Sequence, residues 1–206
     1  MTYIGFSMWH NGLGIPLSEK EIDIYIERFL TINPNIDSKR LETLRVFLKE
    51  DDGDDLIMVN AIKLYDKPLQ VPDVSPNETS KEVLGRYNNF VMPFLLKRGS
   101  YPVLVGYAVM NSIEVWGVEN AKEWTMAGVI RYRSRRDMME MSTNPEFLKV
   151  HKFKIAAMEK TIAFPVTPRF VAGGVEIVAA LFLFSVAAFF HLVICILGQK
   201  KMRVSV

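Results

Sequence analysis

The sequence predicts an α+β domain, in which two helices cover one face of a four-stranded antiparallel sheet, followed by one C-terminal transmembrane helix. Two observations carry this prediction. From residue 56 onward, runs of β-branched and aromatic residues alternate with segments whose apolar residues repeat at helical spacing. Near the C-terminus, residues 177–197 contain no formal charge if His191 is neutral. A helix of this length is roughly 30 Å long, the thickness of a bilayer's hydrocarbon core.

The composition excludes two broad classes of protein. Half of the 206 residues are apolar, and the formal net charge is only +2. Such a chain is neither a disordered tail nor a strongly basic nucleic-acid binder. Cys195 is the single cysteine, so neither an internal disulfide nor a cysteine metal cluster is expected.

Residues 1–55 are expected to form an N-terminal helical segment. Ser18 and Glu21 have the spacing of a capping box, and apolar residues then repeat at helical spacing. A second helix is expected to begin near Asp37 and to end at an acidic turn, residues 50–55. This turn resembles a calcium loop only in composition, because Leu48 stands where the first ligand is needed. An exposed turn is the simpler interpretation.

Residues 56–168 are expected to form one α+β domain. Strands are predicted at residues 56–65, 102–113, 123–132 and 160–166. Helices are predicted at residues 79–97, 134–141 and 144–158, the last two capped by Ser134 and Asn144. The order is therefore β-α-β-β-α-β, with a pair of helices at the second helical position. This is the split βαβ order of a ferredoxin-like sandwich.

Both faces of the predicted sheet carry apolar residues. In the first strand, Leu56, Met58 and Ile62 share one face, whereas Ile57 and Val59 lie on the other. Helices cover only one face of such a sheet, and a solvated second face would carry polar residues. A second copy of the chain, the N-terminal helices or a partner subunit is therefore expected to cover the second face.

One membrane span is expected over residues 169–198, followed by a short basic tail over residues 199–206. The first residues lack the basic and apolar regions of a signal peptide. Lys200, Lys201 and Arg203 favour a cytoplasmic tail, whereas a long domain without a signal is hard to export. We expect a single-pass protein in the lipid bilayer, with its folded domain in the cytoplasm.

Seven segments of residues 56–166 carry a family resemblance: MVNAIKLY (58–65), GRY (85–87), VMPFLLKRGS (91–100), IRYRSRRDMMEM (130–141), NPEF (144–147), HKFK (151–154) and MEKT (158–161). Together they resemble an uncharacterised bacterial domain family of the dimeric α+β barrel superfamily. The resemblance covers residues 56–166, and the membrane span looks like an addition to it. It implies a dimer in which two sheets face each other. The superfamily includes cofactor-independent monooxygenases, haem enzymes and domains without known activity, so the fold alone does not choose a function.

His151 is the candidate catalytic residue. It shares a helical face with Leu148, Ile155 and Met158, so its imidazole is expected to point into the cleft between helix and sheet. A histidine there could be a general base or, as the resemblance implies, an axial haem ligand. A semi-buried structural histidine is the simpler alternative. No second titratable residue is tied to His151 by the sequence, and no cofactor is predicted.

The densest basic cluster consists of four arginines. They are Arg131, Arg133, Arg135 and Arg136. Such a cluster could contact an anionic substrate, lipid head groups or an acidic partner surface. A solvated rim with local salt bridges is the alternative.

Two polar residues of the predicted span are expected to take part in helix packing in the membrane. Glu176 lies at the boundary, where it can reach water. His191 lies deeper, and polar groups in a span usually face protein rather than lipid. A neighbouring helix of a larger assembly would provide that contact.

Two functions fit these observations. The preferred one is a non-catalytic accessory or structural subunit of a larger membrane complex. The alternative is a membrane-tethered enzyme or small-molecule binder of the dimeric α+β barrel type, with haem among the ligands considered, that uses the cleft near His151. The sequence contains no phosphate-binding glycine loop, HExxH, GxSxG or CxxC motif, and no metal site is predicted.

Overall fold

The computed structural model describes residues 3–169, 171 and 174–204, with side chains described up to residue 197. The chain forms two compact units. One unit is Asn11–Pro168, and the other combines Met1–His10 with Arg169–Val206.

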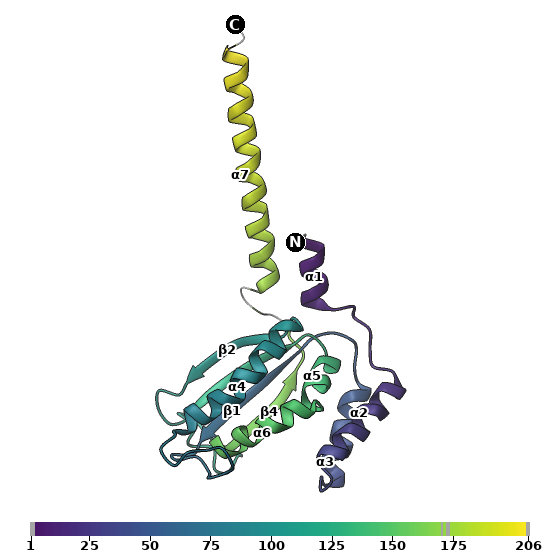
Figure 1. The fold of residues 1–206 in the computed structure, drawn as a ribbon, viewed down its shortest axis with the longest axis vertical. Coiled ribbons are helices and arrows are strands. Elements are labelled where there is room, and N and C mark those ends of the chain that lie inside the picture. The colour runs from purple at the N-terminus through teal and green to yellow at the C-terminus, as the bar shows by residue number, and fades with distance from the viewer. Residues whose placement is uncertain (1–2, 170, 172–173, 205–206) are drawn as a thin grey trace. The chain divides into compact units, whose positions relative to one another are not determined.

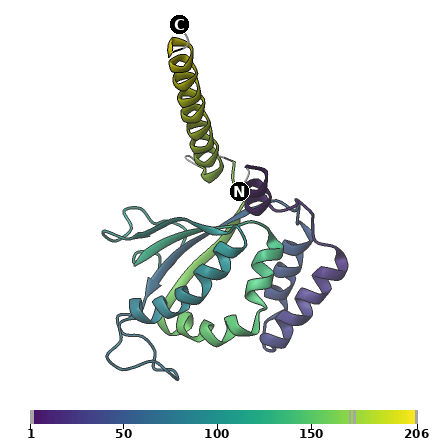
Figure 2. The same cartoon turned by 45° about the horizontal axis from the view of Figure 1, so that its top comes forward.

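The larger unit contains the predicted antiparallel sheet (Figure 1). Its strands are β1 (Leu56–Leu64), β2 (Tyr101–Tyr107), β3 (Met126–Tyr132) and β4 (Met158–Val166), in the spatial order β2-β3-β1-β4. Helix α4 (Ser80–Lys97) connects β1 to β2, while α5 (Arg135–Ser142) and α6 (Pro145–Ala157) connect β3 to β4. Helices α4 and α6 lie on one face of the sheet (Figures 1 and 2). The ferredoxin-like α+β fold is confirmed.

The connection between β2 and β3 differs from the prediction. Strand β2 ends at Tyr107 rather than near residue 113, and β3 begins at Met126 rather than at residue 123. Ladder pairing stops at the Tyr107–Met126 pair. Gly117 and Asn120 have positive φ angles of 72° and 55°, which an extended strand does not adopt. The apolar run therefore continues past the strand into an exposed loop.

The N-terminal helices begin where the caps predict. In α2 (Glu19–Ile32), Ser18 and Glu21 form a complete capping box, and Asp37 caps α3 (Ser38–Lys49). Helix α1 (Tyr3–Asn11) was not predicted. Helices α2 and α3 pack on each other and on Met139 of α5.

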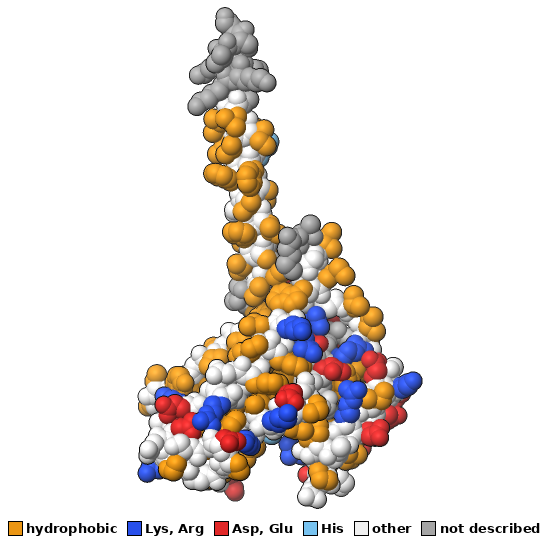
Figure 3. Space-filling model, in the orientation of Figure 1, with side chains coloured by type: hydrophobic (Ala, Val, Ile, Leu, Met, Phe, Trp, Pro, Cys, Tyr) orange, Lys and Arg blue, Asp and Glu red, His pale blue; other side chains and the backbone are white. Residues whose placement is uncertain are grey.

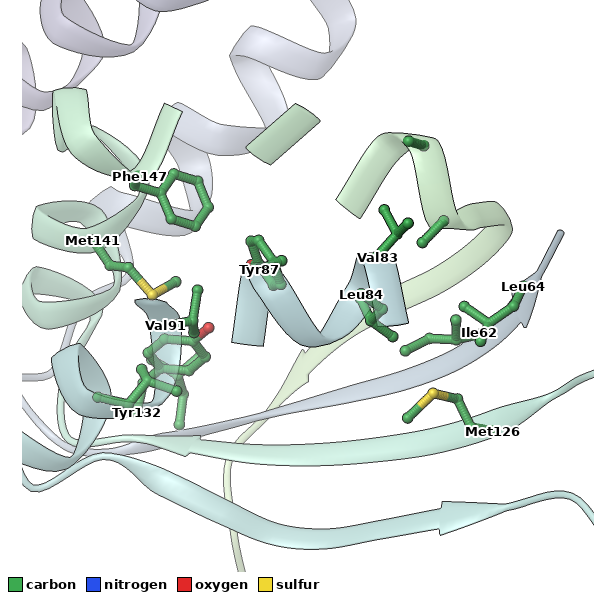
Figure 4. Packing of buried hydrophobic residues seen from close by; sticks show 14 residues of the cluster. Ile62, Leu64, Val83, Leu84, Tyr87, Val91, Met126, Tyr132, Met141 and Phe147 are labelled. Carbon is green, nitrogen blue, oxygen red and sulfur yellow. The ribbon is translucent and has the colours of Figure 1, made fainter. Parts of the chain in front are cut away.

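The main core lies between the sheet and α4. In Figure 4, Leu84 of α4 points toward the strands that carry Ile62 and Met126, while Tyr87 of α4 lies toward Phe147 of α6. These apolar residues follow the two periods expected of a helix on a strand, because they repeat every three or four positions in α4 and every second position in the strands.

The other face of the sheet is apolar and open. The register places Leu104 of β2 next to Val129 of β3, and Phe164 of β4 next to Val59 of β1. Leu104, Ile162 and Phe164 are 51%, 43% and 48% exposed. Because α2 and α3 pack against α5 instead, the N-terminal helices are not the cover of this face.

The smaller unit contains α7 (Val175–Val204). Residues Val175–Leu197 have a mean hydropathy of 2.6 and form a helix long and apolar enough to cross a membrane. The side chains of its most apolar window are not buried, and hydrophobic groups cover this helix in the space-filling view (Figure 3). The helical backbone continues into the predicted basic tail, but the side chains of Lys200, Lys201 and Arg203 lie outside the described residues.

Candidate functional site

A cleft of about 450 Å³ lies within the larger unit, between the sheet and the helices that cover it. The surface is indented between the part formed by α2 and α3 and the part formed by the sheet and α6 (Figure 3). Strands β1 and β3, helices α4, α5 and α6, and the α2–α3 pair all contribute to the lining. We call this space the cleft.

Small residues leave room on the sheet side of the cleft. Asn60 of β1 pairs with Gly128 of β3 on one side and with Ala163 of β4 on the other. A Cβ atom added to Gly128 would meet no other atom within 4 Å, so the missing side chain is open space. The Asn60 amide nitrogen donates to the carbonyl oxygens of Met58 and Gly128, both at 3.1 Å. Among the described residues, its side-chain oxygen accepts no hydrogen bond.

Methionines dominate the apolar lining. Of the eleven methionines in the sequence, seven line the cleft as the structure describes it: Met58, Met92, Met126, Met138, Met139, Met141 and Met158. Methionine is flexible and polarisable, and surfaces rich in it adapt to ligands of different shape. The lining is therefore apolar and adaptable.

Helix α6 directs His151 into the cleft, as predicted. The imidazole lies between two aromatic rings, with centroid distances of 5.3 Å to Phe147 and 6.4 Å to Tyr87. Burial, and then the positive charges of Lys154 and Arg40, lower the pKa of His151 below its ordinary value. His151 is therefore neutral at pH 7. Ile155, predicted on the same stripe, is 55% exposed, because the inward face of α6 runs through Phe147, His151 and Lys154.

Lys154 also lines the cleft, and the sequence analysis missed it. Its ammonium lies 5.7 Å from the centroid of the Tyr87 ring, and burial lowers its pKa. The signal was present in the sequence, because Phe147, His151 and Lys154 stand at positions i, i+4 and i+7 of one helix. A lysine on the apolar face of a helix is an exception that calls for an explanation.

The four arginines of the basic cluster are held by internal partners. Arg131 is 5% exposed; its Nε donates to Asp55 at 2.5 Å and its NH1 to the Gly99 carbonyl at 2.9 Å. Arg133 binds Asp137 through two nitrogens, at 2.7 and 3.1 Å. The local salt bridges that the sequence left open as an alternative are therefore present at this end of the strand.

Arg135 and Arg136 reach the N-terminal segment. Arg135 donates to the carbonyl oxygen of Phe47 at 2.5 Å, with its Nε 3.8 Å from Asp51. Arg136 donates to Glu21 at 3.1 Å and to the carbonyl oxygens of Ile15 and Pro16. These bonds connect α5 to the segment that carries α2 and α3.

The acidic turn takes part in the same contacts. The Asp51 side chain is 1% exposed, and its Oδ2 accepts from the Leu17 amide at 2.7 Å. Together with Asp55, it provides carboxylates for the arginines. The turn is therefore a structural partner of the basic cluster rather than a simple exposed turn. No group of three or more potential metal ligands occurs among the residues described.

The two predicted span residues lie in the smaller unit. Glu176 Oε1 lies 3.6 Å from Nδ1 of His10 of α1. His191 is exposed on α7, and its Nε2 lies 3.6 Å from Sγ of Cys195, one turn along the same helix. A role of these residues in packing against other membrane helices stays a prediction.

Comparisons with known proteins support the fold and leave the function open. No family model and no curated protein matches the chain. A protein of unknown function from Rhodopseudomonas palustris is 21% identical, with a TM-score of 0.52, over 63% of this chain and 94% of that one. Its methylated form gives a TM-score of 0.53 at the same identity, over 64% and 93%.

A more distant structure is a dimeric protein of unknown function with a ferredoxin-like fold, from Bacteroides fragilis. It is 15% identical, with a TM-score of 0.34, over 55% of this chain and 96% of that one. The likeness to the Rhodopseudomonas palustris protein shows a shared fold of the α+β domain.

Proposed function

We propose that this protein is a membrane-anchored module whose α+β domain binds a small, largely apolar molecule in the cleft. The observation that carries the proposal is the cleft itself, a space of about 450 Å³ with an apolar, methionine-rich lining and a few polar groups. Small-molecule sites typically have volumes of about 300–1,000 Å³ and this mixture of lining residues.

In this proposal the polar groups of the lining bind the ligand. His151 is the one imidazole in the lining as described, and Lys154, Arg40, Tyr87 and Tyr132 are the other titratable groups there. We assign His151 a binding role, with Asn60 and Asn88 as further polar contacts.

The anchor in this proposal is α7. Its apolar residues are exposed along a length that suits a bilayer, which a water-soluble protein would not tolerate. We further propose that α7 spans the bilayer and so anchors the α+β domain to the membrane.

A variant that fills the cleft tests the binding proposal. Gly128→Leu would place a side chain in the open space beside Asn60, whereas Ala127→Leu adds the same side chain to the opposite face of β3. The full chain in lipid nanodiscs, with labelled methionine methyl groups, can be titrated with decanol and decanoate while NMR follows Met58 and Met126. Met110 in the exposed loop is the internal control.

We expect saturable shifts of Met58 and Met126 with at least one probe in the parent and in Ala127→Leu, and their loss in Gly128→Leu. If no probe shifts the cleft methionines of the parent, or if Gly128→Leu binds as well as the parent, the cleft is not a binding site.

A second candidate function rests on the open sheet face. Leu104, Ile162 and Phe164 form an exposed apolar surface of the kind that marks a protein–protein interface. We propose that either a second copy or another membrane subunit covers it, the latter making this chain an accessory subunit of a larger complex. Helices of that complex would also pack against His191.

The composition of the native, detergent-solubilised protein distinguishes a second copy from another subunit on the open sheet face. The complex can be solubilised from its own membranes in mild detergent, sized by gel filtration and analysed by mass spectrometry. Foreign subunits in stoichiometric amounts would support an accessory role, and a homodimer would support self-association. A monomer in every detergent would contradict both.

A further inference from the structure

Lys154 differs from the other two lysines of α6 in its ion pairing. Lys149 of α6 is paired with Glu146 at 2.6 Å, and Lys152 is paired with Asp73. Lys154 of the same helix has no carboxylate partner within the described part of the chain, nor do His151 and Arg40, which line the same cleft. Lys149 and Lys152 are thus each paired with a carboxylate, and Lys154 is not paired with one among the described residues.

An unpaired ammonium in an apolar lining is costly. Removing a charge from water without a counter-charge is unfavourable, so buried lysines are usually paired. The Tyr87 ring face offers Lys154 only a weak compensating attraction. Arg40 and Lys154 also repel a proton on His151, which adds to the positive potential around the site. An anion is the ligand that would relieve these costs.

In the lining as described, the bases lie on the helix side of the cleft, whereas the sheet side is mostly apolar. Arg40 belongs to α3 and His151 and Lys154 to α6, whereas β1 and β3 contribute Met58, Ile62 and Met126. A ligand that satisfies both sides has an acidic head group toward α3 and α6 and an apolar body against the sheet.

We propose, building on the proposed binding function, that the natural ligand is an amphiphile with an anionic head group, and that Lys154, His151 and Arg40 bind that head group. The head is a carboxylate or a phosphate monoester, because both accept charge-assisted hydrogen bonds from ammonium and guanidinium groups. The source is either a free organic acid or a membrane lipid with a single acyl chain.

Three probes with the same alkyl chain test the ligand class: decanoate, decyl phosphate and decanol. Each is titrated into the full chain in zwitterionic nanodiscs, with the Met58 and Met126 methyl groups as the readout and empty nanodiscs as the correction for partitioning. One charge-assisted hydrogen bond corresponds to a roughly tenfold or greater difference in Kd. We therefore expect at least one anion to bind about tenfold more tightly than decanol.

The matched variants are Lys154→Met and Lys149→Met, two lysines of one helix. Lys154→Met should raise the Kd of the anion to near that of decanol and leave decanol unchanged, while Lys149→Met should change neither. A tighter decyl phosphate would identify a lipid-like phosphate head, and a tighter decanoate a carboxylic acid.

Two results overturn the inference. One is equal binding of decanol and both anions, which leaves the cleft a binding site without charge selectivity. The other is unchanged anion binding in a folded Lys154→Met protein, which assigns the selectivity elsewhere. Absence of any probe from the cleft would instead contradict the proposed function itself.

Discussion

The domain contains two groups of basic residues with opposite surroundings. The four arginines of the basic cluster, from the end of β3 to the start of α5, each find a carboxylate or a backbone carbonyl, and Arg131 is almost completely buried. The bases of the cleft, Arg40, His151 and Lys154, lie beside apolar and aromatic residues without a carboxylate in the described lining. Paired cations hold elements together, whereas unpaired ones in a cleft are available to a ligand.

Whether a basic residue has an ion-pair partner distinguishes structural from ligand-binding residues more clearly than the local density of basic residues does. In the sequence, the arginines form the densest basic cluster and so attract attention as a binding site. Lys154 is one of 25 lysines and arginines and stands in a less dense basic stretch, residues 149–154. The protein uses its conspicuous cations to connect α5 to the N-terminal segment and leaves inconspicuous ones in the cleft.

The largest expected effect is loss of the Arg131 ion pair. Arg131→Met would leave Asp55 and the Gly99 carbonyl without their partner in a mostly buried site. Breaking a buried pair costs about 3–5 kcal/mol, and the partly exposed Asp55 places this case near the lower limit. Chemical denaturation of the parent and variant measures the change.

The comparison variant is Lys149→Met, which removes the exposed pair with Glu146. Exposed pairs contribute about 0–1 kcal/mol, so its effect should be small. Similar decreases in the free energy of unfolding for Arg131→Met and Lys149→Met would mean that the arginine cluster is a solvated rim.

A smaller effect of opposite sign is expected in the cleft. Lys154→Met removes a half-buried ammonium that has no carboxylate beside it in the described lining, and replaces it with an apolar chain of similar length. We expect the free energy of unfolding without ligand to rise by about 1 kcal/mol, because an uncompensated polar group costs about 1–3 kcal/mol in proteins. Thermal unfolding of both proteins measures this gain. A loss of stability would indicate that Lys154 has a structural partner.

The smallest expected effect is the pH dependence that His151 gives to stability. Its pKa is lowered in the folded state, so the unfolded chain binds the proton more tightly. The contribution of His151 is fully present above the unfolded value of about 6.5 and is lost as pH falls through the lowered folded value. His151→Gln should therefore lose less stability than the parent between about pH 7 and pH 5. Unfolding curves across this range measure the difference, and identical slopes would contradict a buried His151.

Local signals in the sequence predicted much of the fold. Ser18, Asp37, Thr79, Ser134 and Asn144 each cap a helix in the structure, because capping depends on residues within one turn. The order of strands and helices also followed from local periodicity. Strand ends were less predictable, since the apolar residues after Tyr107 continue the pattern while ladder pairing stops.

The long-range pairing could not be predicted in this way. Arg131 meets Asp55 across 76 positions, and Arg136 meets Glu21 across 115. No local pattern joins such residues, so the basic cluster and the acidic turn were interpreted as separate features. His151 was identified because the face of one helix shows it. Lys154 was missed because its charge suggested an exposed position, although its spacing placed it on the same face.

The pKa of His151 with and without an anion is the most direct test of the contrast between paired and unpaired bases. It can be followed by the imidazole signals of the full chain during a pH titration, first alone and then with saturating decanoate or decyl phosphate. An anion held by Lys154 and Arg40 would offset their positive charge beside His151 and favour its protonated form. We expect the pKa of His151 to rise when an anionic probe is bound and to stay unchanged with decanol. An unchanged pKa under saturating anion would show that the head group does not lie among these bases, and would contradict the account.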